Sequence, residues 1–162
     1  MPAIPRSCYA NSDGGRQRTE DRKQRTERIS KVYCVSERIS SFKDLRVYQL
    51  AFELQQQIFE KSKQFPSEER YALTDQIRRA SRSIGANLAE AWQKRRYMAH
   101  FISKLSDADG EQAETQHWLD TASACNYVSE KAQKALLEQC VHVGKMLGTM
   151  MAKPEKFCHE PR

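Results

Sequence analysis

From residue 41 to residue 153 the chain contains one proline, Pro66, and only four glycines. Proline and glycine are the residues that most often interrupt helices, so long helices can form on both sides of Pro66. Strand signals are absent from the same span, which has no run of alternating β-branched residues and no hairpin turn. Its one Asp-Gly pair, Asp109-Gly110, lies inside a helical pattern. These features predict an all-α fold.

Four segments repeat apolar residues every three or four positions, from about 41 to 65, 69 to 92, 97 to 122 and 130 to 153. The predicted core positions are Leu45, Tyr48, Ala51, Phe52, Ile58, Phe59, Leu73, Ile77, Ala80, Ile84, Leu88, Trp92, Phe101, Ile102, Leu105, Ala108, Leu119, Ala122, Ala132, Ala135, Leu136, Val143, Met146, Leu147 and Met150, with Leu50 and Leu54 alongside. Four amphipathic helices with short links predict an antiparallel up-down-up-down four-helix bundle over residues 41–153. Residues 154–162 would form a C-terminal tail.

Local signals place the ends of these helices. Ser40 or Ser41 can cap the first helix, and Ser129 can cap the fourth. Pro66 should end the first helix, because the residue before a proline is disfavoured in helical geometry. Residues 93–96 (QKRR) look like the second connection, and Pro154 follows the last periodic segment.

Residues 1–40 differ from the rest of the chain. They carry nine basic and five acidic side chains, a net charge of +4, and residues 16–28 have no periodic apolar face. Such a segment buries too little apolar surface to offset the entropy lost on ordering. It is predicted to be a basic flexible arm, for which we consider nucleic-acid binding and an extension without function.

Cysteine content and apolar runs indicate in which compartment the protein is expected. The chain has an odd number of cysteines, five, with no Cys-x-x-Cys pair. Residues 1–10 show no signal-peptide pattern, so reduced thiols and a cytoplasmic location are expected. Cys125 and Cys140 have apolar neighbours and are predicted to lie in the core. No apolar run approaches the roughly 18 residues that a membrane-spanning helix needs.

Few residues suggest catalysis or metal binding. Glu114 and His117 have the Glu-x-x-His spacing of di-iron bundles, but the chain holds only one such pair where two are needed. Nucleophile-elbow and phosphate-loop motifs are absent. We therefore expect no enzyme activity, no cofactor and no metal, and a solvated Glu–His pair.

The strongest charge feature of the helical part lies between Gln76 and Arg96, with a net charge of +5. Glu90 is the one acid in this stretch. The candidate nucleic-acid-binding residues are Arg78, Arg79, Arg82, Lys94, Arg95 and Arg96. Arginine binds phosphate bidentately while its stem covers apolar surface. The alternative is a solvated helix face whose arginines pair with acids of the third helix, namely Asp107, Asp109, Glu111 and Glu114.

Gly85 and Asn87 lie in the middle of the second predicted helix, although both are poor helix formers. Gly85 would permit close helix packing. Asn87 would be either a buried hydrogen-bonding residue, fixing register or an oligomer contact, or a plain exposed side chain.

Three runs in order, residues 42–51 (FKDLRVYQLA), 65–80 (FPSEERYALTDQIRRA) and 83–90 (SIGANLAE), resemble one bacterial family. It is the four-helix-bundle family encoded in intervening sequences of 23S ribosomal RNA. The accessory variability determinants of diversity-generating retroelements belong to the same group. The resemblance covers about residues 42–152.

The resemblance implies an antiparallel four-helix bundle that assembles into a basic homopentameric barrel and binds RNA or DNA. In retroelements the family also engages a reverse transcriptase, so an adaptor for such a partner is the alternative function. By motif, residues 76–79 and Arg82 would supply basic surface, and Asn87 and Glu90 would have structural or oligomer-contact roles. The sequence departs from the family pattern at Ala91, where the family has Gly, and at Glu111, where it has a small Ser.

Overall fold

The computed structural model describes residues 39–158, so the predicted basic arm, apart from its last two residues, lies outside the described residues. Four long helices account for most of this range: α2 (Arg46–Ser62), α3 (Asp75–Lys94), α4 (Met98–Ala124) and α5 (Glu130–Ala152). The described residues contain no strand. The predicted all-helical bundle is therefore confirmed.

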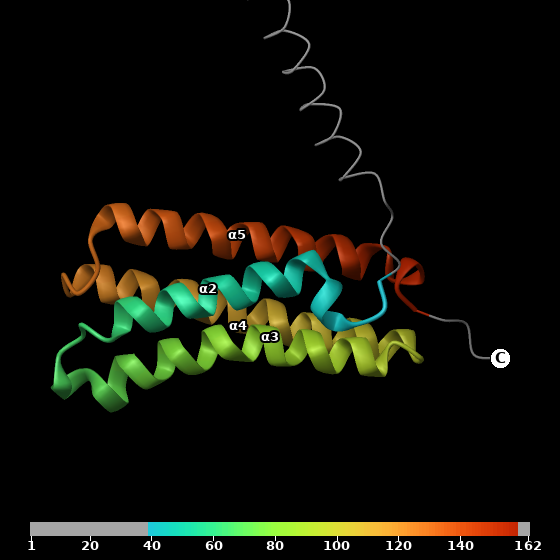
Figure 1. Ribbon diagram of the computed structural model, residues 1–162, viewed down its shortest axis with the longest axis horizontal. Coiled ribbons are helices and arrows are strands. Elements are labelled where there is room, and N and C mark those ends of the chain that lie inside the picture. The colour runs from blue at the N-terminus through green and yellow to red at the C-terminus, as the bar shows by residue number, and fades with distance from the viewer. Residues whose placement is uncertain (1–38, 159–162) are drawn as a thin grey trace, which may run out of the picture. The chain divides into compact units, whose positions relative to one another are not determined.

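The four helices pack in a ring (Figure 1). Each helix contacts its two neighbours, α2 with α3, α3 with α4, α4 with α5, and α5 with α2. Successive helices run in opposite directions in Figure 1, and the loops that join them lie at alternate ends of the bundle. The connection between α3 and α4 is shorter than predicted, because α3 continues through Lys94 and α4 begins at Met98.

Side-chain caps explain two of the helix starts. Ser41 caps a short 3₁₀ turn, η1 (Phe42–Asp44), in a reciprocal capping box with Asp44. Ser129 caps α5 by accepting a hydrogen bond from the backbone N–H of Ala132, as predicted. The first predicted helix thus begins with a 3₁₀ turn, and α2 itself starts four residues later than η1.

The second predicted helix begins irregularly. A 3₁₀ turn, η2 (Ser67–Glu69), and a π-helical turn, η3 (Arg70–Thr74), precede α3. The π turn has buried Leu73 and Thr74 on one side, whereas Tyr71 is 75% exposed. A π turn inserts extra backbone into a helix and changes the direction in which the preceding side chains point.

Most predicted core positions are buried between the helices. The buried residues on which the prediction was right include Leu45, Ala51, Ile58, Leu73, Ile77, Ala80, Ile84, Leu88, Trp92, Phe101, Leu105, Ala108, Leu119, Ala122, Leu136, Val143, Leu147 and Met150. Burial of these side chains supplies the main stabilisation of the bundle. None of the described helices combines the length and the apolar character needed to cross a bilayer.

Some core predictions were wrong. Phe52 is 48% exposed, because it lies one residue, or about 100°, around α2 from the buried Ala51. Ala135 is exposed on α5. Cys125 is also exposed, because α4 ends at Ala124 and the chain turns away through Asn126, which has a φ of 60°. Cys140 is buried as predicted, and burial raises the pKa of its thiol to about 12.

The segment after Lys153, predicted as a tail, packs on the bundle as far as Cys158. Pro154 is buried at the start of a 3₁₀ turn, η4 (Pro154–Lys156). The ring of Phe157 stacks on Phe101 of α4 with their centroids 5.9 Å apart. The bundle therefore extends a few residues beyond its predicted boundary.

Gly85 is buried against α2, where its nearest neighbour is the ring of Tyr48. A Cβ atom at this position would lie 3.6 Å from Cε2 of Tyr48, which is an ordinary van der Waals distance. The approach of α2 to α3 therefore does not depend on glycine, contrary to the prediction.

Candidate nucleic-acid interface

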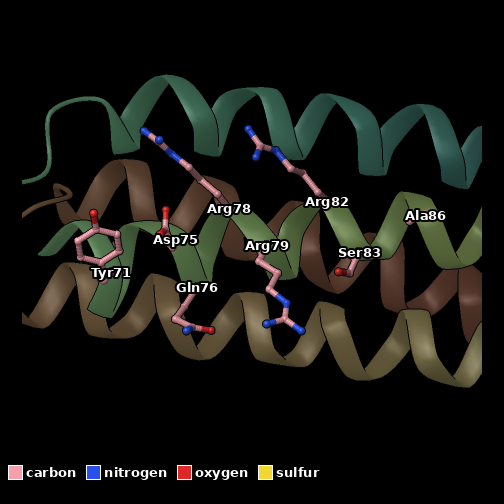
Figure 2. Close-up of a pocket in the computed structure, with 8 residues that line it drawn as sticks. All are labelled: Tyr71, Asp75, Gln76, Arg78, Arg79, Arg82, Ser83 and Ala86. Atoms are coloured by element: carbon pink, nitrogen blue, oxygen red, sulfur yellow. The ribbon is translucent and has the colours of Figure 1, made fainter.

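A shallow groove runs along the outer surface of η3 and the first half of α3 (Figure 2). Its lining residues are Tyr71, Asp75, Gln76, Arg78, Arg79, Arg82, Ser83 and Ala86. Their spacing of three or four residues keeps them on one side of the helix, opposite the buried stripe that includes Ile77 and Ile84. Three of the predicted binding arginines therefore share one groove.

Arg78 is held against α2 by two contacts. Its Nε atom donates a hydrogen bond to Oγ of Ser62 over 2.7 Å. Its guanidinium carbon lies 5.0 Å from the ring centroid of Phe59. A half-buried arginine fixed in this way retains free N–H groups that can bind an anion.

Phe59 contacts three cations at once. Besides Arg78, the guanidinium of Arg82 lies 5.6 Å from its centroid and the ammonium of Lys63 lies 4.7 Å from it. The negative face of an aromatic ring attracts cations at these distances. Phe59, predicted to be a core residue, is only half-buried, and its ring orients basic side chains on the α2–α3 seam.

Arg79 points the other way. Figure 2 shows Arg78 and Arg82 directed toward α2, whereas Arg79 is directed toward α4. On that side burial and the nearby Glu114 raise the pKa of Glu111, while the positive charge of Arg79 opposes this shift. The three arginines thus cover the exposed surface of α3 from one neighbouring helix to the other.

The predicted alternative was that these arginines pair with acids of the third helix. Within residues 39–158, no carboxylate lies within 4.0 Å of a guanidinium nitrogen of Arg78, Arg79 or Arg82. Asp107, one of the predicted partners, instead pairs with Lys104 at 3.1 Å. The three arginines therefore form a basic surface that is open to a ligand, and they do not form ion pairs with acids of the third predicted helix.

The other three predicted basic residues form a separate group at the far end of α3. Lys94 is twelve residues beyond Arg82, or about 18 Å along the helix. It pairs with Glu90 at 3.5 Å. Arg96 is exposed and lies 5.8 Å from the ring centroid of Tyr97. The six predicted residues therefore do not make one continuous site.

Arg95 is the predicted residue least suited to ligand binding. It is half-buried, its guanidinium lies 4.0 Å from the ring of Trp92, and its Nη1 atom donates to the carbonyl of Trp92. These contacts place the side chain on the end of the bundle. There the side chain contributes to packing against Trp92.

Asn87 and Glu90 meet Lys104 across the α3–α4 seam. The Nζ atom of Lys104 lies 3.1 Å from Oε2 of Glu90, 3.1 Å from Oδ2 of Asp107, and 3.4 Å from Oδ1 of Asn87. The hydrogen bond from Lys104 lowers the pKa of Glu90, and the hydrogen bond to Asp107 raises the pKa of Lys104. Both residues thus link α3 to α4. Asn87 is half-buried, between the two predicted alternatives.

The predicted Glu–His pair is engaged with an aromatic residue. Oε1 of Glu114 accepts a hydrogen bond from Nε1 of Trp118 over 3.0 Å, and the ring of His117 packs against the same tryptophan. In the part of the chain that the structure describes, no three His, Cys, Asp or Glu side chains gather as metal ligands would.

Sequence reasoning missed Tyr71, which lines the groove, and also Ser62 and Lys63, which lie beside its arginines. A signal existed for Tyr71, which is four residues before Asp75 and eight before Arg79, and so lies on their side of the helix. The π turn itself, which exposes Tyr71, could not be predicted from the spacing of the apolar residues. Ser62 is the last residue of α2 and Lys63 is its C-cap, so their proximity to the arginines of α3 depends on how α2 and α3 pack.

The fold and this surface define an all-helical bundle protein with a basic groove along its second long helix. The model of one family, the 23S rRNA-intervening sequence protein, matches residues 43–149. The chain belongs to this family, as the sequence motifs indicated.

A solved structure supports the same assignment. It is a Bacteroides thetaiotaomicron protein, described as having unknown function and coming from the S23 ribosomal protein family. The two chains are 27% identical with a TM-score of 0.60, and the match covers 65% of this chain and 95% of that chain. No curated protein matches the sequence.

Proposed function

We propose that this protein is a non-catalytic nucleic-acid-binding bundle whose α3 groove binds the phosphate backbone. One observation carries the proposal: Arg78, Arg79 and Arg82 line the same open groove, and no described carboxylate pairs with them. Guanidinium groups recognise phosphate oxygens with two parallel hydrogen bonds.

The contacts of two of these arginines with residues of α2 support the proposal. Ser62 and Phe59 restrict Arg78, and Phe59 also restricts Arg82. Side chains that are already ordered lose less entropy when a ligand binds. Lys94, about 18 Å farther along α3, and Arg96, which follows the end of that helix, would contact the backbone of a longer strand.

RNA is the first ligand to test, and DNA is the second. The description of the family refers to the 23S rRNA intervening sequence. Contacts limited to phosphates would not distinguish base sequences. Affinity should therefore depend strongly on salt, with a logarithmic slope of about −2 for three arginine contacts to a single strand.

We also propose that the bundle acts as a homo-oligomer, with a pentamer as the expected form. Large apolar side chains are exposed at separate places on its surface, including Phe52 on α2, Met98 on α4 and Val141 on α5. Apolar side chains scattered singly in this way are ordinary on a protein surface, so the expectation of a pentamer comes from the family resemblance of the sequence motifs. A ring would also place several α3 grooves on one particle and strengthen its electrostatic field.

A direct binding measurement tests the main proposal. Fluorescence anisotropy of a labelled 20-nucleotide RNA would compare the wild-type protein with the double variant Arg78→Glu and Arg82→Glu. We expect the double variant to lose binding while its circular dichroism spectrum stays unchanged. The same titration with DNA of equal length separates the two ligands.

The control variant reverses the same number of charges elsewhere. Lys134 and Lys145 are exposed on α5, which lies diagonally across the bundle from α3. The double variant Lys134→Glu and Lys145→Glu should bind nearly as well as the wild type. Equal losses in both variants would show that net charge alone drives binding. Absence of nucleic-acid binding by the wild type would favour the adaptor for a reverse transcriptase.

A further inference from the structure

The middle of the α3 groove differs chemically from its end at η3 (Figure 2). Arg78, Arg79 and Arg82 lie at its middle, whereas Tyr71, Asp75 and Gln76 lie together at the end nearest η3. A phosphate would be attracted to the arginines and repelled by the carboxylate of Asp75. The η3 end therefore suits a neutral part of the same ligand.

Tyr71 presents an unusually open aromatic surface. It is 75% exposed, the largest fraction among the large exposed hydrophobic side chains of the described residues. The guanidinium of Arg70 lies 5.6 Å from its ring centroid and makes the surroundings of the ring positive. The adjoining Leu73 and Thr74 are buried, so the π turn anchors the backbone beneath the exposed ring.

We propose that Tyr71 stacks an unpaired nucleobase, so that the ligand of the groove is single-stranded nucleic acid. This inference rests on the proposed function, because the same strand would place its phosphates on Arg78, Arg79 and Arg82. Proteins that bind single strands combine a positive track for the backbone with aromatic side chains for the bases. In a duplex the bases are stacked and paired, and they present no free face to Tyr71.

Asp75 and Gln76 give the η3 end a means to discriminate bases. The carboxylate of Asp75 accepts hydrogen bonds, so it suits the exocyclic amino group of adenine or cytosine. Uracil has no exocyclic amino group, and its one donor, N3–H, lies between two carbonyl oxygens that a carboxylate repels. The groove should therefore bind oligoadenylate more tightly than oligouridylate.

Stacking is tested with two variants of one residue. Tyr71→Ala removes the ring, and Tyr71→Phe keeps it while removing only the hydroxyl group. We expect Tyr71→Ala to weaken binding of a labelled 12-nucleotide oligoadenylate by about tenfold or more, and Tyr71→Phe to bind within about twofold of the wild type. The slope of affinity against salt should stay unchanged in both, because no phosphate contact is removed.

The inference also predicts a spectroscopic signal and a ligand preference. A 2-aminopurine base within the oligonucleotide should lose fluorescence on binding to the wild type and retain it with Tyr71→Ala. A blunt RNA duplex of the same length should bind more weakly than the single strand. Asp75→Asn should reduce the ratio of oligoadenylate to oligouridylate affinity.

The outcomes separate this inference from the proposed function. If the wild type binds oligoadenylate but Tyr71→Ala binds it equally well, the stacking role is wrong and the phosphate role stands. Equal affinity for duplex and single strand would also overturn the inference. If the wild type binds neither oligoadenylate nor oligouridylate, the proposed function itself fails. If Tyr71→Ala changes the native mass of the assembly while leaving 2-aminopurine fluorescence quenched, Tyr71 is a subunit contact and the stacking role is wrong.

Discussion

The Nε atom of Arg78 on α3 donates a hydrogen bond to Oγ of Ser62 on α2 over 2.7 Å. The hydroxyl of Ser62 in turn donates to the backbone carbonyl of Phe59 over 3.0 Å. Ser62 is 2% exposed, so water does not compete effectively for its hydroxyl. This chain of hydrogen bonds fixes the stem of Arg78 and leaves its two terminal nitrogens for a ligand.

Ser62→Ala should therefore weaken both stability and binding. The variant leaves Nε of Arg78 without its acceptor, which we expect to lower the free energy of unfolding by about 1 kcal/mol. RNA affinity should fall severalfold because the guanidinium loses its fixed orientation. Urea unfolding and anisotropy measure the two effects. Ser103→Ala, at an exposed position of α4, is the control and should change neither quantity.

Phe59→Leu tests whether the ring orients the basic side chains. Leucine keeps most of the apolar packing but removes the π face near Lys63, Arg78 and Arg82. Each lost cation–π contact is worth about 0.5–1 kcal/mol at a partly exposed site. We expect weaker RNA binding in the same anisotropy assay.

Phe52→Leu is the matched control for Phe59→Leu. Phe52 lies two turns earlier on α2, stacks on Tyr48, and has no cation over its ring among the described contacts. It should leave RNA affinity unchanged in the same assay. A loss of binding in Phe52→Leu as large as that in Phe59→Leu would contradict the orienting role.

The sequence was sufficient to predict the helices because the apolar period is strong and breakers are few. Leu73, Ile77, Ile84 and Leu88 repeat at helical spacing, and all are buried. Where two apolar residues are adjacent, periodicity does not show which of them faces the core. For this reason Phe52 was predicted to be buried together with Ala51.

The candidate site was predictable only in part. The positions of Arg78, Arg79 and Arg82 on the outer face of α3 follow from spacing along one helix. Their separation from Arg95 and Arg96 depends on distance along that helix and on packing at its end. The contacts of Arg78 with Ser62 and Phe59 cross between helices, and no local pattern encodes which residues of α2 lie opposite it.

The ion pair of Lys104 with Glu90 makes stability depend on pH. The pKa of Glu90 is lower in the folded protein than its usual value of 4.5, chiefly through the hydrogen bond from Lys104. In the acid range the unfolded chain therefore binds more protons at this site than the folded one. The contribution of the pair is complete well above pH 4.5 and is lost as the pH falls through the lower folded value.

Lys104→Met should reduce this acid-sensitive part of the stability. We expect the midpoint of thermal unfolding to fall less steeply between pH 5 and pH 3 in the variant than in the wild type. Lys131→Met, at an exposed position of α5 that lacks a described ion pair, should keep the wild-type slope. Parallel curves for the wild type and Lys104→Met would show that the pair adds no pH dependence.

Two glycines of α5 should respond differently to replacement by alanine. A Cβ atom at Gly148 would meet nothing within 4 Å, whereas one at Gly144 would lie 3.2 Å from Oε1 of Gln112. Alanine in a helix interior is favoured over glycine by about 0.5–1 kcal/mol, so Gly148→Ala should stabilise the bundle by that amount.

Gln112 is only 4% exposed, and its Nε2 atom lacks a described partner, so its amide has little room to yield. Gly144→Ala should therefore gain less than Gly148→Ala or destabilise the protein, as urea unfolding would measure. An equal gain from both substitutions would mean that α4 and α5 pack more loosely around Gln112 than the structure shows.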